Sequence, residues 1–131
     1  MWTLAWLLYA CLIIASGVYH TDFVMHSHWE FVKWLPPAAE IGTYGFWQDL
    51  AVNVLLYVPF GLLFLHSREH ITRRTMLLAV ASGLLLSCGV EFYQLYSHNR
   101  RAAPSDIVCN VTGTWLGVWV YRNRLRQTLG D

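Results

Sequence analysis

Charge is what this sequence has least of: only 13% of its 131 residues are Asp, Glu, Lys or Arg, whereas 56% are hydrophobic. These fractions lie outside the range usual for soluble domains. A soluble helical bundle needs a charged face on every helix, and the long apolar stretches here offer none. The net charge of +1 leaves no strongly basic surface for nucleic acid. We therefore expect an integral membrane protein without a nucleic-acid partner.

Cysteine motifs and a secretory leader are missing as well. The three cysteines, Cys11, Cys88 and Cys109, fall in apolar stretches without CxxC or Cys/His spacing, so we interpret them as packing residues. No positive charge precedes the first apolar stretch, as one would in a signal peptide. Residues 15–17 form a passable small-residue cleavage site, but we interpret the stretch as a retained helix.

Metal-binding patterns are weak. The first loop carries histidines and acids within a short segment: His20, Asp22, His26, His28 and Glu30. An HSH pair on an exposed loop has no favoured ligand geometry, so we expect a solvated loop. Acids in the apolar segments suit a hard divalent cation, but the arginines near them argue against one. We predict neither a metal nor a cofactor.

Long apolar stretches, in contrast, are plentiful. Four of them approach the roughly 20 residues that a helix needs to cross a bilayer. They cover residues 2–19, 47–65, 76–96 and 104–121, and the first and last are rather short. The predicted fold is all-α: a polytopic membrane protein with four transmembrane helices in a single domain over residues 1–131.

The arginines predict the orientation of these helices. Six of the nine basic residues lie in the second connection and the C-terminal tail: Arg68, Arg73, Arg74, Arg122, Arg124 and Arg126. In a four-helix arrangement these segments share one side, which the positive-inside rule places in the cytoplasm. Both termini are then cytoplasmic, and the first and third connections face outward.

The first outward connection, residues 20–46, is rich in aromatic side chains. Trp29, Phe31, Trp34 and Phe46 lie in it, and Pro36 begins a Pro-Pro break. Tryptophan and tyrosine favour the headgroup layer of a membrane. We expect this aromatic loop to lie on or dip into the outer leaflet, with a short interfacial helix before the prolines.

Three expected spans carry an acid and an amide three or four residues apart: Asp49 with Asn53, Glu91 with Gln94, and Asp106 with Asn110. These spacings place both members of a pair on one helix face. The predicted orientation brings all three pairs to the outer leaflet, where Arg100 and Arg101 connect two of the helices. Since each buried charge costs about 2.5–3.5 kcal/mol at mid-helix, the pairs are tolerable if they face one another. We predict a nearly neutral polar pocket among the outer halves of these helices.

Ordinary structural roles stay open for several of these residues. Ser105 or Asp106 fits the cap of a helix that starts at Pro104, and Asp49 at a helix mouth invites the same interpretation. Glu91 has no such explanation, because it lies inside a span near a helix C-terminus, where the dipole disfavours an anion. It is the strongest single candidate for a functional site.

Two further pairs also have structural interpretations. Asn53 and Asn110 can bridge helices by hydrogen bonds rather than bind a ligand. Gly113 and Gly117, four residues apart, fit a close-packing helix face better than a site.

The chain resembles the VanZ-like family of small membrane proteins. The resemblance rests on three blocks: Asp-x-x-x-Asn, an apolar run and Pro-Phe-Gly over residues 49–61; Glu91 with Gln94; and Arg101 followed by Ser105, Asp106, Asn110 and Gly113. It covers about residues 47–121, and Arg100 is an alternative for the family arginine. The resemblance implies a bacterial inner (cytoplasmic) membrane protein, and the family name comes from a member linked to low-level teicoplanin resistance.

The first functional hypothesis is a pocket that binds or remodels an anionic lipid, a lipid-linked cell-envelope molecule or a lipoglycopeptide. Its expected ligand-binding residues are Arg100, Arg101, Gln94, Asn53, Asn110 and Ser105. The second is a membrane hydrolase or transferase acting on such a lipid, with Glu91 as acid or base and Asp49 or Asp106 as a second carboxylate. A small transporter and a purely structural role for the polar residues remain further alternatives.

Overall fold

The computed structural model describes residues 1–19 and 21–129, and side chains of the last helix up to residue 124. Its helical elements follow in the order α1 (Trp2–Val18), the 3-10 turn η1 (Trp29–Phe31), α2 (Ala38–Ile41), α3 (Tyr44–His66), α4 (Arg73–Gln94) and α5 (Pro104–Leu129). Over these residues the only β pairing is one isolated antiparallel bridge, between Phe23 and Ser97. The predicted all-α class is confirmed.

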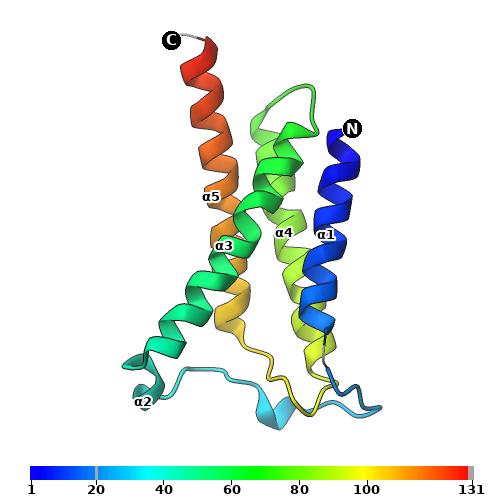
Figure 1. Cartoon of the computed structure of the whole chain (residues 1–131), viewed down its shortest axis with the longest axis vertical. Helices are drawn as coiled ribbons and strands as arrows, with labels where there is room; N and C mark the ends of the chain where they lie inside the picture. The colour runs from blue at the N-terminus through cyan, green and yellow to red at the C-terminus, as the bar shows by residue number, and fades with distance from the viewer. Residues whose placement is uncertain (20, 130–131) are drawn as a thin grey trace.

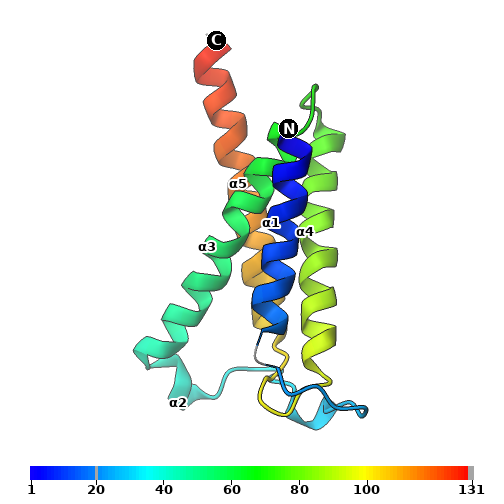
Figure 2. The same cartoon turned by 45° about the vertical axis from the view of Figure 1, so that its right-hand side comes forward.

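The four long helices α1, α3, α4 and α5 form one bundle (Figures 1 and 2). The N-terminus, the α3–α4 connection and the far end of α5 lie together at one end, which we call the basic end because it carries five arginines: Arg68, Arg73, Arg74, Arg122 and Arg124. The opposite end, here the loop end, carries the α1–α3 loop and the α4–α5 connection. In both views the first half of α3 diverges from the other helices toward the loop end.

Local capping sets where two of the long helices begin. The Thr43 hydroxyl accepts a hydrogen bond from the Phe46 amide at 3.3 Å, so α3 begins at Tyr44, three residues before the predicted start. Thr72 and Thr75 form a reciprocal capping box that starts α4 at Arg73, likewise earlier than predicted.

The aromatic loop between α1 and α3 contains two short helical turns. The 3-10 turn η1 precedes Pro36, where a short helix was expected, and α2 follows directly after Pro37. These two turns and the segment between them expose large apolar side chains: Trp29, Phe31, Trp34, Leu35 and Ile41. The loop therefore offers an apolar, aromatic surface at the loop end of the molecule.

Small residues let α3 and α5 approach closely. A side chain at Gly113 would collide with the Val54 carbonyl of α3, and one at Gly117 with the Val58 carbonyl. Such small residues at spacings of four are typical of helix pairs packed in membranes. The predicted close-packing face of α5 is thus confirmed.

Two helices, α3 and α4, are long and apolar enough to cross a membrane. Only 28% and 22% of their apolar windows are buried, so they are unlike the core helices of a soluble protein, which are mostly buried. Of the four predicted membrane spans, two are therefore supported. With 17 residues, α1 is apolar but short. The helix α5 is less apolar because of its polar residues, of which Asn110 and Thr114 are buried in the bundle.

Replacing Gly117 by alanine will destabilise the α3–α5 pair, because its methyl group must displace the Val58 backbone. Overpacking of this kind costs about 1–3 kcal/mol. The matched control is Gly89→Ala in α4, where an added methyl group meets nothing. Thermal unfolding in detergent micelles should show a lower Tm for Gly117→Ala only; equal Tm values for the two variants would contradict the close packing.

Candidate functional site

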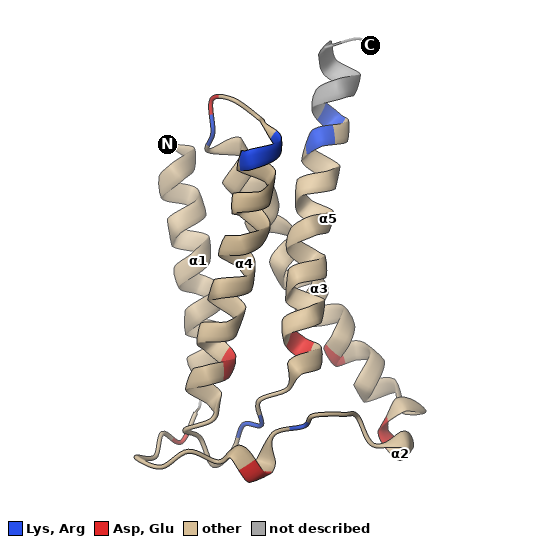
Figure 3. Cartoon of the chain, turned by 180° about the vertical axis from the view of Figure 1, so that it is seen from behind, with Lys and Arg blue, Asp and Glu red and all other residues tan. Residues whose placement is uncertain are grey.

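A cavity of about 870 Å³ opens at the loop end of the bundle. It is lined by the last turns of α1, the first half of α3, the end of α4, the start of α5 and both loops. All nine residues predicted to form a pocket line this one cavity: Asp49, Asn53, Glu91, Gln94, Arg100, Arg101, Ser105, Asp106 and Asn110. Figure 3 shows the acidic positions of α3, α4 and α5 gathered toward this end. Acidic side chains from three separate helices thus line the same cavity.

Glu91 has a specific partner. Its side chain is 7% exposed, and its Oε2 accepts a hydrogen bond of 2.8 Å from the backbone amide of Ala103, directly before α5. The carboxylate therefore lies at the positive N-terminal end of α5, which compensates for its unfavourable position near the C-terminal end of α4. The sequence alone suggested no structural role for Glu91. The hydrogen bond with Ala103 gives it one.

Two amides connect helices. Asn110, 5% exposed, donates from Nδ2 to the Ser87 hydroxyl of α4 at 2.8 Å, so its predicted alternative as a helix bridge is confirmed. Gln94 donates from Nε2 to the Gly17 carbonyl of α1 at 3.3 Å. The Oδ1 atom of Asn110 remains buried with no hydrogen-bond partner among the described residues. Asn110 therefore keeps one free acceptor at the cavity wall.

The two aspartates lie on either side of the α3–α5 contact. The Asp106 carboxylate interacts with the side chains of Ser105 and Asn53, and Ser105 donates to it at 3.4 Å. Asp49 is close enough to add its negative field. Asp49 is exposed and lies within α3. Because Thr43 caps this helix, the interpretation of Asp49 as a helix cap is wrong.

The basic side chains at the cavity differ in their partners. Lys33, from the aromatic loop, contacts the Glu40 carboxylate at 3.2 Å. Arg100 and Arg101 are exposed, and neither forms an ion pair within the described part of the chain. No ion pair therefore joins these arginines to Asp49, Glu91 or Asp106 in this part of the chain. Four acids and three bases line the cavity, so its charges nearly balance, although only Lys33 and Glu40 are in direct contact among the described residues.

Apolar packing closes the cavity toward the basic end. Ile13 and Tyr57 line the cavity and also pack with Phe60 in one buried cluster. A second cluster lies farther along the bundle: Phe64, Leu65, Ala79 and Val118. The polar space thus opens at one end of the bundle and stops at buried apolar side chains.

Comparison of the sequence with known families identifies the family of this chain. The VanZ/LLP1 family model matches residues 2–126, nearly the whole chain. The chain belongs to the VanZ/LLP1 family. Family membership and the two long apolar helices together indicate a membrane protein. Searches of curated proteins and of solved structures found no match.

Sequence reasoning missed several residues of this VanZ/LLP1 cavity. Lys33 and Glu40 reach it because the aromatic loop folds back, held by a 3.0 Å hydrogen bond from the Lys33 amide to the Ala102 carbonyl. Nothing in the local sequence indicates that contact. Sequence reasoning also missed Ser87, which is not a cavity residue but the hydrogen-bond partner of Asn110. It lies four residues before Glu91 and thus on the same helix face, which is the signal that could have found it.

Removing the Glu91 carboxylate will destabilise the protein through the Ala103 amide. Glu91→Ala leaves that buried amide unpaired, at a cost of about 1–3 kcal/mol. Glu91→Gln keeps an acceptor oxygen and should cost much less. Thermal unfolding of both variants in the same detergent separates the two. Equal losses would mean that the negative charge, rather than the hydrogen bond, stabilises the α4–α5 junction.

Proposed function

We propose that this VanZ/LLP1 protein is a multi-pass protein of the bacterial inner membrane whose cavity binds the headgroup of an anionic lipid or cell-envelope amphiphile. The observation that supports this proposal is that some polar residues around the cavity have protein partners and others do not. Glu91, Gln94 and Asn110 have protein partners, whereas Arg100 and Arg101 stand exposed at its rim without ion pairs in the described chain. Guanidinium groups bind phosphate and carboxylate with paired, charge-assisted hydrogen bonds.

Apolar side chains exposed on all four long helices support the membrane arrangement. Each helix presents large hydrophobic residues outward, such as Leu8 on α1, Leu55 on α3, Leu85 on α4 and Trp115 on α5. A soluble monomer rarely exposes apolar surface over so much of its circumference. The arginines of the basic end favour the cytoplasmic side for that end, which directs the cavity and the aromatic loop outward.

The cavity also suits an amphiphile rather than a free ion. Apolar residues of α3, Leu50, Val52 and Leu56, line it beside the charged groups. A volume of about 870 Å³ falls in the range of small-molecule sites. A phosphate or carboxylate headgroup would contact the arginines while an acyl chain follows α3. The acyl tail of a lipoglycopeptide such as teicoplanin fits the same description, which connects the proposal to glycopeptide resistance.

An enzyme is the second candidate, and the presence of both Asp49 and Asp106 in the cavity lining favours it. In that case one of these acids, or Glu91, transfers a proton during hydrolysis or transfer of the bound lipid. Chemical change of the lipid after incubation with the purified protein would support this alternative. Transport is the weakest alternative, because apolar clusters close the cavity toward the basic end.

The double variant Arg100→Gln/Arg101→Gln should bind phosphatidylglycerol at least about tenfold more weakly than the unchanged protein. A charge-assisted hydrogen bond contributes about 1.5–3 kcal/mol, and about 1.4 kcal/mol corresponds to a tenfold change in affinity. Native mass spectrometry from detergent micelles measures lipid retention, with phosphatidylcholine as the zwitterionic comparison.

Arg73→Gln/Arg74→Gln is the matched control, because this adjacent, exposed pair lies at the basic end. It should leave phosphatidylglycerol binding unchanged. Equal losses for the two double variants, or no preference of the unchanged protein for the anionic lipid, would refute the headgroup site.

The proposed orientation predicts that reporters fused to the C-terminus act in the cytoplasm. A green fluorescent protein fusion should fluoresce in cells, and an alkaline phosphatase fusion at the same place should be inactive. The reverse pattern would place the cavity on the cytoplasmic side.

A further inference from the structure

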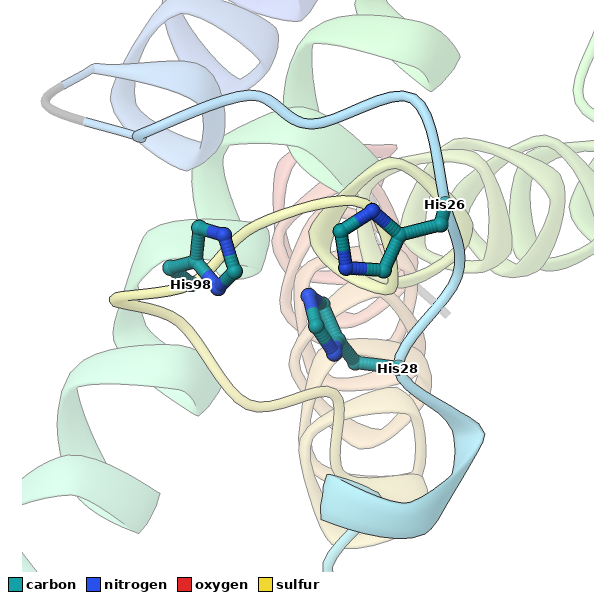
Figure 4. Close-up of side chains that lie close together, drawn as sticks. All are labelled: His26, His28 and His98. Atoms are coloured by element: carbon teal, nitrogen blue, oxygen red, sulfur yellow. The ribbon is translucent and has the colours of Figure 1, made fainter.

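Three histidines meet at the loop end, outside the cavity described above. His26 and His28 come from the aromatic loop, and His98 from the α4–α5 connection. Their ring centroids are 4.6 Å apart for His26 and His28, 4.8 Å for His28 and His98, and 5.7 Å for His26 and His98. One possible ligand nitrogen from each lies within 4.8 Å of the others. Figure 4 shows the three rings turned toward a common space.

His28 is the centre of this cluster. Its side chain is 7% exposed, and its Nδ1 lies 3.1 Å from the Glu30 carboxylate. Because an ionised carboxylate only accepts hydrogen bonds, this contact places the ring proton on Nδ1 and leaves a lone pair on Nε2. That Nε2 atom is buried and has no hydrogen-bond partner within the described residues. Buried polar atoms without a partner are uncommon in folded proteins, and a bound ion is one way to satisfy them.

The backbone fixes the two loops that carry the rings. The Val24 amide donates to the Tyr96 carbonyl and the His28 amide to the Leu95 carbonyl, both at 2.8 Å. The His98 amide donates to the Asp22 carbonyl at 3.2 Å. These hydrogen bonds hold the histidines together before any ligand binds, which lowers the entropic cost of forming a site.

We propose that His26, His28 and His98 form a binding site for Zn²⁺. Three imidazoles suit zinc, whereas calcium and magnesium require oxygen ligands. The hydrogen bond from His28 Nδ1 to Glu30 matches the carboxylate–histidine–metal arrangement that orients ligating imidazoles. Zinc–nitrogen bonds of about 2.0–2.1 Å require the ligand nitrogens to approach to roughly 3.4 Å. His26 and His98 are exposed and can turn to close the present gap.

The sequence analysis predicted a metal-free first loop from the residues of that loop alone, without His98 of the α4–α5 connection. The HSH pair supplies two ligands, and the third comes from a distant connection that only the fold brings near. His20, which belonged to the same sequence cluster, lies outside the described residues. Since the three ligands span both loops, bound zinc would cross-link the aromatic loop to the connection that carries Arg100 and Arg101.

Zinc binding to the full-length protein tests the site directly. The affinity tag is removed, the protein in detergent micelles is treated with EDTA, and Zn²⁺ is titrated by calorimetry. We expect one ion per chain, and visible absorption bands of four-coordinate Co²⁺ when cobalt replaces zinc. Zinc should also raise the Tm, since a ligand that binds only the folded state stabilises it.

Variants identify the ligands. His98→Ala and His28→Ala should each weaken zinc binding by at least about 100-fold, and Glu30→Gln by about 10- to 100-fold. The control is His70→Ala, an exposed histidine at the basic end, which should bind zinc normally. Elution volume and helical circular dichroism of the metal-free variants confirm folding. If His28→Ala fails to fold, the exposed positions His26 and His98 carry the test.

Two results would overturn the proposal. One is the absence of saturable binding of a single zinc ion to the unchanged protein. The other is equal loss of zinc affinity in His98→Ala and His70→Ala, which would indicate nonspecific binding to surface histidines.

Discussion

The hydrogen bond from the Ala103 amide to Glu91 holds the loop end together. It joins the last turn of α4 to the start of α5, and it places a carboxylate where the amides of α5 are unpaired. Polar groups buried in a protein need hydrogen-bond partners there, because removing them from water without a partner costs free energy. This single contact satisfies two of them, a buried acid and a buried amide. Together with the close packing of α5 on α3, it helps to position the start of α5, which carries Asp106 and Asn110.

The same requirement separates two kinds of polar residue around the cavity. Asn110 and Gln94 hold α5 and α1 against α4, and their donors are used inside the protein. Arg100 and Arg101 lie in the connection between helices, where water or headgroups can solvate them. A family motif that combines acids, amides and arginine therefore contains scaffold and candidate binding groups together. Their order in the sequence does not distinguish them.

Helix periodicity made much of this arrangement predictable. Spacings of three and four placed Asp49 with Asn53 and Glu91 with Gln94 on shared faces, and the order of the apolar stretches brought them to one end. Their function stays a prediction. Helix starts were missed by up to three residues because threonine caps extend α3 and α4 beyond their apolar cores. The Lys33 contact and the meeting of the histidines depend on non-local backbone hydrogen bonds, which no local pattern encodes.

The divergence of α3 from the bundle has a consequence for how a ligand would arrive. Leu50, Val52 and Leu56 give the cavity one apolar wall on this diverging helix. If the cavity binds a lipid as proposed, that lipid can enter sideways from the surrounding leaflet by two-dimensional diffusion, without its acyl chain passing through water. Occupancy would follow the mole fraction of that lipid in the leaflet rather than its vanishing aqueous concentration. For a lipid that is abundant in the leaflet, a modest intrinsic affinity would then suffice.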